Sequence, residues 1–408
     1  MSPSDTSRSS APPARVAVVA AGVVSPLGFG LEETAEALRA ARDCVSEVEG
    51  FEVAQCRCHT AGQIADERLR EHGSGSRRAR RRHRAAQMTI AALDEALAQA
   101  PGFKPELTVA GTTSGGMTFG EEYYRALHGH RQLRHTASLI ANYTPQKPMM
   151  DAQEALGVSA PCLVIANACA SGTNAIGHAF ECIRSGRYQR VLAGGYDAIS
   201  ELVFVGFDAL QAATAEKCRP FDAARTGMVI GEGAAILALE NYAAAAARGA
   251  NILAEIVGYG LSTDNHHLTQ PNPSGSAARQ AMEAALERAQ LEPTAIDYIN
   301  AHGTATPFND AAEGRAIAEL FQQRVPVSST KGMMGHSLGA AGAIEAVISL
   351  LALRHQFLPP NINFRETDAE MNLDIVANVA RPARLRTVLS NSFGFGGTNA
   401  SVILRHAA

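Results

Sequence analysis

The stretch Val164-Ile165-Ala166-Asn167-Ala168-Cys169-Ala170-Ser171-Gly172 decides the fold, because it joins a strand to a helix. The apolar run at residues 162–166 predicts a fully buried strand. Residues 172–187 have helical spacing, which predicts a helix with one apolar face. The residues of that face are Ile176, Ala179, Phe180 and Ile183. Cys169 is therefore predicted to lie where a strand ends and a helix begins.

This position favours reactivity in Cys169. A helix N-terminus presents unpaired N–H groups and a partial positive charge. Both features stabilise a thiolate, which is the nucleophilic form of cysteine. The small neighbours Ala168 and Ala170 leave space for a substrate to reach the sulfur. On this stretch alone, a catalytic nucleophile and a buried structural cysteine are equally good interpretations.

The composition excludes several classes of protein. The chain has 408 residues, of which 46% are hydrophobic and 19% charged, so it can bury a large core. Its net charge of −4 provides no overall field that attracts nucleic acid or an anionic membrane. No segment is expected to be long and apolar enough for a transmembrane helix, so we expect no membrane insertion.

The N-terminus and the cysteines predict where the protein works. Residues 1–13 are rich in Ser and Pro without a long apolar core, which predicts a disordered tail rather than a targeting signal. Seven cysteines without a repeating spacing favour reduced thiols and a cytoplasmic location. The cluster Cys56-Arg57-Cys58-His59 lacks a second ligand pair nearby, so we expect no metal site.

Residues 77–84, RRARRRHR, form the strongest charge feature, since six of the eight residues are Arg. One interpretation is the solvated start of a helix over residues 87–98. The other is a docking patch for an acidic partner, with Arg78, Arg81 and Arg82 as its contacts. No aromatic residues interleave with the arginines, as single-stranded nucleic acid would favour, so we expect no nucleic-acid partner.

Strand and helix patterns alternate along the whole chain, which predicts an α/β fold with mostly parallel pairing. The second half repeats the order of the first. We therefore predict an internal duplication, with halves at residues 14–250 and 251–408. Residues 196–226 are predicted to be irregular, as is the segment 43–63. Further predicted strands cover residues 15–24, 107–110, 190–195, 228–240, 252–259, 296–301, 325–328, 388–392 and 400–404.

Four of the predicted strands end in reactive or glycine-rich residues. In open α/β sheets, functional sites gather at the carboxyl ends of strands. These ends carry Cys169, His302, His336 with Lys331, and the glycine-rich loop at Phe395. A single histidine is most often structural. One cysteine and two histidines, each at the end of its own apolar strand, predict a catalytic Cys-His-His site.

These motifs resemble those of beta-ketoacyl-acyl carrier protein synthases of the elongating type, within the thiolase superfamily. The resemblance extends from about residue 15 to residue 404. It implies a thiolase-like five-layered αβαβα fold, built from two pseudo-duplicated halves, and a dimer. The second histidine separates the chain from synthases with a Cys-His-Asn pattern that start chains from acyl-CoA. The motifs are NACASG around Cys169, HGTATPFND from His302 to Asp310, KGMMGH from Lys331 to His336, and NSFGFGGTN from Asn391 to Asn399.

The resemblance implies a decarboxylative Claisen condensation between an acyl group held on Cys169 and a malonyl group on acyl carrier protein. A thiolate can take over an acyl group from a thioester, and the resulting oxyanion needs preorganised donors. The implied donors are the backbone N–H groups of Cys169 and Phe395. His302 and His336 are implied to stabilise the enolate that decarboxylation leaves.

Further roles follow from the same resemblance. Lys331 and Glu313 are implied to orient and polarise the histidines. Phe395 matches a gating residue, while Thr304 and Thr306 match residues that bind the pantetheine arm. The remaining residues assigned to substrate binding are Thr269, Phe207 and Ser114. No resident cofactor is expected, because the phosphopantetheine arm arrives on the carrier protein.

Two departures from the fatty-acid pattern favour a specialised polyketide or polyene pathway. Ser114 occupies a position where a bulky apolar residue often closes the acyl pocket at the dimer interface. Residues 207–211 lack the basic residue expected for docking the carrier protein. The expected assembly is a homodimer or a heterodimer with a chain-length-factor homologue. A non-catalytic, chain-length-factor-like subunit is the alternative function, and the joint presence of Cys169, His302 and His336 disfavours it.

Overall fold

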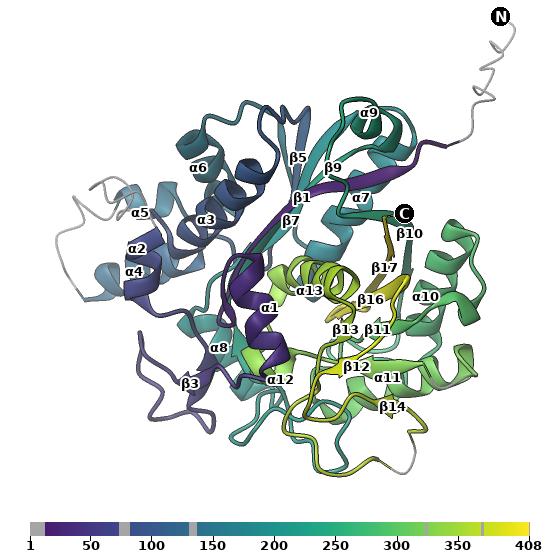
Figure 1. Ribbon diagram of the computed structural model, residues 1–408. Coiled ribbons are helices and arrows are strands. Elements are labelled where there is room, and N and C mark those ends of the chain that lie inside the picture. The colour runs from purple at the N-terminus through teal and green to yellow at the C-terminus, as the bar shows by residue number, and fades with distance from the viewer. Residues whose placement is uncertain (1–12, 73–81, 130–136, 323–324, 369–370, 408) are drawn as a thin grey trace, which may run out of the picture.

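The structure is a computed structural model that describes residues 13–72, 82–129, 137–322, 325–368 and 371–407 (Figure 1). The predicted tail, apart from residue 13, lies outside the described residues. Arg78 and Arg81 of the arginine-rich stretch also lie outside them, whereas Arg82 is described and half-buried.

One large sheet of twelve strands runs through both halves of the chain. Its order is β14-β12-β11-β16-β17-β10-β1-β9-β7-β5-β6, and β2 pairs with β1 beside this path. The strands of the first half are β1 (Val16–Ser25), β2 (Gly28–Phe29), β5 (Leu107–Gly111), β6 (Cys162–Ile165), β7 (Arg190–Asp197) and β9 (Gly233–Asn241). Those of the second half are β10 (Ala254–Thr263), β11 (Tyr298–Asn300), β12 (Pro326–Ser328), β14 (Asp374–Ile375), β16 (Thr387–Gly394) and β17 (Thr398–His406).

The pairing pattern makes the duplication visible. In the first half, β5 is parallel to β6 and to β7, while β9 is antiparallel to β7 and to β1. In the second half, β11 is parallel to β12 and to β16, while β17 is antiparallel to β16 and to β10. The sheet is therefore mixed, and the expectation of mostly parallel pairing was wrong. Tight hairpins such as β16–β17 produce antiparallel neighbours, whereas crossover helices produce parallel ones.

Helices cover the two halves of the sheet in five layers, as the fold prediction expected (Figure 1). α7 (Ser171–Arg184) and α13 (Ala341–His355) form the central layer, and they contact each other and both halves of the sheet. α3 (Arg84–Gln99), with α6 (Lys147–Leu156) packed on it, covers the outer face of the first half. α10 (Ser276–Ala289) and α11 (Pro307–Leu320) cover the outer face of the second. A separate apolar cluster fills each of the three interfaces between helices and sheet.

The central helices begin close together, and glycines make this approach possible. A Cβ added to Gly172 in α7 would lie 2.8 Å from the backbone nitrogen of Ala343. One added to Gly342 in α13 would lie 2.0 Å from Oγ1 of Thr173. The predicted apolar face of α7 lies wholly inside the central cluster. Because Cys169 immediately precedes α7, this packing fixes its place against the start of α13.

Several element predictions need correction. The stretch predicted to be irregular before residue 226 contains α8 (Glu201–Ala209), whose N-terminus is capped by the Ser200 side chain accepting from Val203 N–H. The segment 43–63 contains β3 (Val45–Glu47) and β4 (Thr60–Gly62). The other helices are α1 (Leu31–Arg39), α2 (Asp66–His72), α4 (Met117–His128), α5 (Ala137–Ala141), α9 (Tyr242–Ala247) and α12 (Lys331–Met334). The other strands are β8 (Ile230–Gly231), β13 (Phe357–Leu358) and β15 (Arg381–Pro382).

β6 was predicted to be fully buried, and this prediction was wrong. The strand lies at one end of the large sheet, so it pairs only with β5 among the described strands. Leu163 is 39% exposed at this edge. An apolar run is compatible with a central strand and with an edge strand that a partner covers, and the sequence cannot distinguish them.

The segment Leu338–His355 is long and apolar enough to cross a membrane by length and composition, contrary to our expectation. However, 89% of it is buried inside the protein, where it includes α13. A central helix with sheet on both sides has to be apolar all round, which produces the same sequence signal.

Candidate active site

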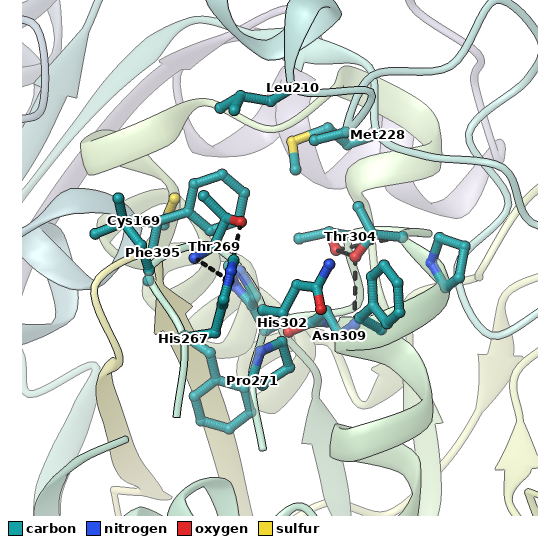
Figure 2. A pocket seen from close by; sticks show the side chains of 18 of the residues that line it. Cys169, Leu210, Met228, His267, Thr269, Pro271, His302, Thr304, Asn309 and Phe395 are labelled. Carbon is teal, nitrogen blue, oxygen red and sulfur yellow. Dashed lines mark hydrogen bonds between the residues drawn. The ribbon is translucent and has the colours of Figure 1, made fainter. Parts of the chain in front are cut away.

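The three predicted catalytic residues, Cys169, His302 and His336, line one cavity of about 170 Å³. Figure 2 shows Cys169 and His302 in this cavity. Thr269, Thr304, Thr306 and Phe395 line it as well. Cys169 comes from the turn after β6, His302 from the end of β11, and His336 from the turn after α12. Phe395 lies in the tight turn between β16 and β17. The ends of β6 and β11 thus meet as the sequence predicted, because both halves of the sheet point them toward the same centre. The prediction that His336 ends a strand was wrong, since α12 lies between β12 and this residue.

Cys169 lies in a short 3₁₀ turn, Ala168–Ala170, that leads directly into α7. Ala168 adopts a left-handed conformation with φ of 58°, which is uncommon without glycine. The Ser171 hydroxyl stabilises the turn by donating to the Ala168 carbonyl oxygen and accepting from Asn167 N–H at 2.9 Å. This strained turn places the sulfur at the cavity while its backbone stays buried.

The environment of Cys169 differs from the expected thiolate site. Burial raises the pKa of the Cys169 thiol to about 12. The charge of Lys331 and the backbone N–H of Phe395 oppose this shift. The N–H of Phe395 therefore faces the sulfur, as expected of an oxyanion donor, but the resting sulfur carries its proton at neutral pH. Attack on a thioester then needs a nearby group that accepts this proton.

His302 and His336 are the groups suited to this transfer. Their ring centroids lie 5.2 Å apart at an interplanar angle of 83°. Burial, with the charge of Lys331 as a second cause, lowers the pKa of both imidazoles well below the usual value, so both are neutral. Among the described residues, neither nitrogen of His336 has a hydrogen-bond partner. Two neutral imidazoles beside a thiol can accept its proton and can donate N–H groups to a substrate oxygen.

Glu313 contacts the backbone of the His302 loop. Its carboxylate accepts from the N–H groups of His302 and Gly303, both at 2.8 Å, and from Asn391 Nδ2 at 3.1 Å. Burial raises the pKa of Glu313 to about 7. The implied role of orienting a histidine is therefore compatible with the geometry, but it acts through the loop rather than through the imidazole.

Lys331 forms a hydrogen-bonded ion pair with Glu345 of α13, and neither side chain is exposed. Glu345 is a candidate site residue that the sequence analysis missed. Its signal was present, since it is the single acidic residue in the otherwise apolar segment AGAIEAVISLLAL. A carboxylate in such a helix needs a buried partner, and Lys331 is that partner.

Of the predicted substrate-binding residues, three threonines line the cavity and Phe207 does not. Thr304 and Thr306 share a hydrogen bond of 2.9 Å between their hydroxyls, and Thr306 caps α11. Thr269 faces the cavity beside His267, whose Nδ1 accepts from its N–H at 3.2 Å (Figure 2). Phe207 does not line the cavity, but its ring stacks on Phe395 with centroids 5.5 Å apart.

The structure does not bring Ser114 to the cavity. Its hydroxyl donates to the carboxylate of Asp197 at 2.8 Å, and the side chain is buried. Of the predicted docking arginines only Arg82 is described, so docking through Arg78, Arg81 and Arg82 stays a prediction. Within the described part of the chain, no group of three or more His, Cys, Asp and Glu side chains is arranged to hold a metal ion.

Sequence comparison identifies two matching family models. Residues 14–245 match the model described as "Beta-ketoacyl synthase, N-terminal domain", and residues 253–365 match "Beta-ketoacyl synthase, C-terminal domain". A Staphylococcus aureus protein, 3-oxoacyl-[acyl-carrier-protein] synthase 2, is 36% identical, covering 96% of this chain and 98% of its own length. A protein of the same name from Vibrio harveyi is 35% identical, covering 97% and 99%.

Solved structures give the same family likeness. The ishigamide ketosynthase/chain length factor superimposes with a TM-score of 0.91 at 33% identity, over 97% of this chain and 100% of that chain. A beta-ketoacyl synthase from Burkholderia phymatum gives 0.87 at 33%, with the same coverage. A type II PKS acyl-carrier protein in complex with its ketosynthase provides a further match, at 0.87 and 29% over the same shares.

Proposed function

Because the chain belongs to the beta-ketoacyl synthase family, we propose that it condenses an acyl group held on Cys169 with malonyl-acyl carrier protein, in fatty-acid or polyketide chain elongation. The observation that carries this proposal is the single cavity in which Cys169, His302, His336 and Phe395 meet. The reaction needs no resident cofactor, because the pantetheine thiol arrives on the carrier protein.

The first half-reaction is transfer of the acyl group. A neutral imidazole accepts the Cys169 proton, and the sulfur attacks the carbonyl carbon of the incoming thioester. A new carbon–sulfur bond forms, and the carrier thiolate leaves and takes up the proton. The N–H groups of Cys169 and Phe395 stabilise the oxyanion of the tetrahedral intermediate.

The second half-reaction forms the carbon–carbon bond. Malonyl thioester loses its carboxylate as carbon dioxide, and the electron pair of the broken bond forms an enolate. His302 and His336 donate N–H groups to the enolate oxygen, and burial together with the charge of Lys331 keeps both rings neutral. The enolate carbon then attacks the Cys169 thioester, and the sulfur leaves as a thiolate that takes a proton from water.

The alternative function is a non-catalytic partner subunit, similar to a chain length factor. Such a subunit needs no nucleophile with two imidazoles in one cavity. All three are present here and share the cavity with Phe395. The catalytic function is therefore the better supported one.

We propose acyl carrier protein as a partner, together with a second subunit of the same fold. The edge strand β6 supports a dimer, because exposed apolar side chains lie on it and on the segment that precedes it in the sequence. These side chains are Ile140, Tyr143, Met150 and Leu163. The second subunit is either a copy of this chain or a chain-length-factor homologue.

We also propose a cytoplasmic location. All seven cysteines are free thiols rather than disulfides, which supports this location.

Separating the two half-reactions tests the proposal. Decarboxylation needs an anion-stabilising site but no thiol, so Cys169→Ala should lose acyl loading and condensation while carbon dioxide release persists. His302→Ala and His336→Ala should still load acyl groups, but their decarboxylation should fall on the order of a hundredfold. Intact-protein mass measures loading, and radiolabelled carbon dioxide release measures decarboxylation.

The same assays define what would contradict the proposal. Circular dichroism and thermal unfolding establish that each variant is folded. If folded Cys169→Ala stopped carbon dioxide release completely, the proposed division of labour would be wrong. If the unchanged protein failed to load any acyl group from a graded series of carrier thioesters, the non-catalytic function would replace the catalytic one.

A further inference from the structure

Asp197 is a fully buried carboxylate at the end of β7, and a cage of hydrogen-bond donors surrounds it. Most donors come from the loop that follows β5. Oδ1 accepts from Thr112 Oγ1 at 2.7 Å, Ser114 N and Oγ at 2.8 Å, and Gly115 N at 3.3 Å. Oδ2 accepts from Thr113 N at 2.8 Å and from Gly339 N at 2.7 Å. The proposed reaction assigns no role to this carboxylate.

The bond from Gly339 sets this cage apart from a local loop anchor. Gly339 lies three residues after His336, in the 3₁₀ turn Leu338–Ala340 that leads into α13. Asp197 belongs to the first half of the chain, as does Cys169. Oδ2 of Asp197 therefore links the half of the chain that contains Cys169 to the turn that directly follows His336.

The backbone around this bond is packed without spare room. A Cβ on Gly339 would lie 2.5 Å from the backbone of Thr112 and Thr113. One on Gly195 would lie 2.9 Å from the Gly339 carbonyl oxygen, and one on Gly172 would lie 2.8 Å from the same oxygen. The start of α7, the end of β7 and the turn after His336 thus meet at Gly339.

Other contacts hold His336 to the first half of the chain as well. Its N–H donates to the Val229 carbonyl oxygen at 2.7 Å, and its own carbonyl oxygen accepts from Gly231 N–H at 2.9 Å. These bonds fix one end of the turn. The bond from Gly339 to Asp197 fixes the other end, so the imidazole is held from both sides.

We propose that Asp197 is a positioning residue that sets the place of His336 relative to Cys169 through its bond to Gly339 N–H. This inference rests on the proposed function. The Asp197 side chain makes no hydrogen bond to Cys169, His302 or His336, and its positioning role acts through the turn. Its charge is in addition a minor cause, after burial, of the raised pKa of Cys169. Bond formation between an enolate held by both imidazoles and a thioester on Cys169 depends on the place of His336, whereas acyl loading needs one imidazole as a proton acceptor, and His302 can supply it.

The chemistry of the cage makes asparagine an informative replacement. An amide has one acceptor oxygen, which would keep the place of Oδ1 because four donors converge there. Its NH₂ group would then replace Oδ2 and face the N–H groups of Thr113 and Gly339. Asp197→Asn therefore breaks the bond to the His336 turn and leaves most of the loop cage in place.

The test compares the two half-reactions in the full-length protein. We expect Asp197→Asn to slow condensation of pre-acylated enzyme with malonyl-carrier protein on the order of a hundredfold. Acyl loading of Cys169, followed by intact mass, should slow by less than about tenfold. The final extent of acyl loading measures the active fraction of each preparation. Loss of folded protein lowers the loading rate and the condensation rate equally, so it leaves the ratio of the two rates unchanged.

Two variants serve as controls. Ser114→Ala removes one donor to Oδ1 but leaves the bond to Gly339, so the ratio of the two rates should stay as in the unchanged protein. Asp297→Asn weakens a carboxylate that accepts from Arg386 and Thr387 N–H at the opposite end of β11, and it should also leave the ratio unchanged.

The outcomes separate the inference from the proposed function. Equal losses of loading and condensation in Asp197→Asn would overturn the positioning role, as would unchanged rates. If Asp197→Asn does not fold, Asp197→Ser removes Oδ2 and with it the acceptor of the Gly339 N–H, so a selective loss of condensation there would support the role and equal losses would overturn it. Failure of the proposed function is recognised separately, because the unchanged protein would then neither load nor condense.

Discussion

The Lys331–Glu345 pair is the residue-scale feature on which the chemistry and the stability of this enzyme both depend. Neither side chain is exposed, so each charge depends on the other for compensation. Burial raises the pKa of Glu345 to about 7, while Lys331 opposes this shift. The same lysine is the second cause, after burial, of the lowered pKa of His302 and His336.

Removing the lysine alone should therefore be costly. We expect Lys331→Met to lower the free energy of unfolding by about 3–5 kcal/mol, because it leaves Glu345 buried without a partner. The double variant Lys331→Met with Glu345→Gln should be more stable than the single variant. Both variants should release carbon dioxide more slowly than the unchanged protein, and at the same rate, because both lack the lysine. Urea unfolding at one protein concentration measures the first effect. A double variant less stable than the single one would contradict this account.

At this scale the sequence predicted the reactive groups but not how they are supported. Cys169 and His302 follow apolar strands, and strand ends converge in this class of fold, so their meeting was predictable. His336 follows the helix α12 instead, although it lines the same cavity. Glu345 and Asp197 were missed because neither stands beside a reactive residue in the sequence. Their partners lie 14 residues or more away, and only packing brings them together.

At the scale of single elements, α3 begins with an unusual cap. The buried His83 ring accepts from Ala85 N–H at 3.1 Å through Nδ1, and its Nε2 lies 2.6 Å from Thr118 Oγ1. Burial lowers the pKa of His83 to about 4. The cap therefore needs a neutral imidazole, since a protonated Nδ1 cannot accept.

This cap should make stability depend on pH. The unfolded pKa is about 6.5 and the folded pKa about 4, so the unfolded chain binds more protons between these values and acid favours unfolding. Between pH 6.5 and pH 4, this group should remove up to about 3 kcal/mol of stability. Because Asn caps helices without titrating, His83→Asn should reduce the slope of stability against pH. An identical slope in both proteins would show that His83 does not titrate in this way.

The contact between α7 and α13 supplies a second element-scale prediction. Gly342→Ala would place a methyl group 2.0 Å from Thr173 Oγ1, so the helices must move apart. We expect the free energy of unfolding to fall by about 1–3 kcal/mol or more. Gly206→Ala in α8 is the matched control, because a Cβ there meets no atom within 4 Å. Alanine should stabilise α8 by up to about 1 kcal/mol. Thermal unfolding distinguishes the two, and a stabilising Gly342→Ala would contradict the packing argument.

Element predictions succeeded where periodicity was strong. The apolar face of α7 and the strands that precede the site were predictable, because burial on a sheet imposes a regular pattern. The helix α8 was missed because its residues ELVFVGFDA are apolar on more than one side. Leu202 and Val205 are exposed there, at 60% and 41%. Apolar residues that stay exposed remove the one-sided pattern by which an amphipathic helix is predicted.

At the scale of the whole molecule, the edge strand β6 predicts the assembly. Arginine at position 163 would put a charge into the proposed interface. Leu163→Arg should therefore shift the protein from dimer to monomer in sedimentation velocity, at concentrations where the unchanged protein is dimeric. Val379→Arg, which changes a side chain that is 68% exposed outside β6, should leave the dimer intact. A dimeric Leu163→Arg would place the interface elsewhere.

The seam between β1 and β10 joins the two halves of the sheet, through pairs such as Val16–Ile256 and Ala17–Glu255. β1 has β9 on its other side and β10 has β17, so neither strand can be removed without opening a sheet. The two halves of the chain therefore share one continuous sheet. A recombination that joins the halves of two relatives near residue 250 must therefore keep the pairing between β1 and β10. The two halves of this enzyme cannot be exchanged independently of each other.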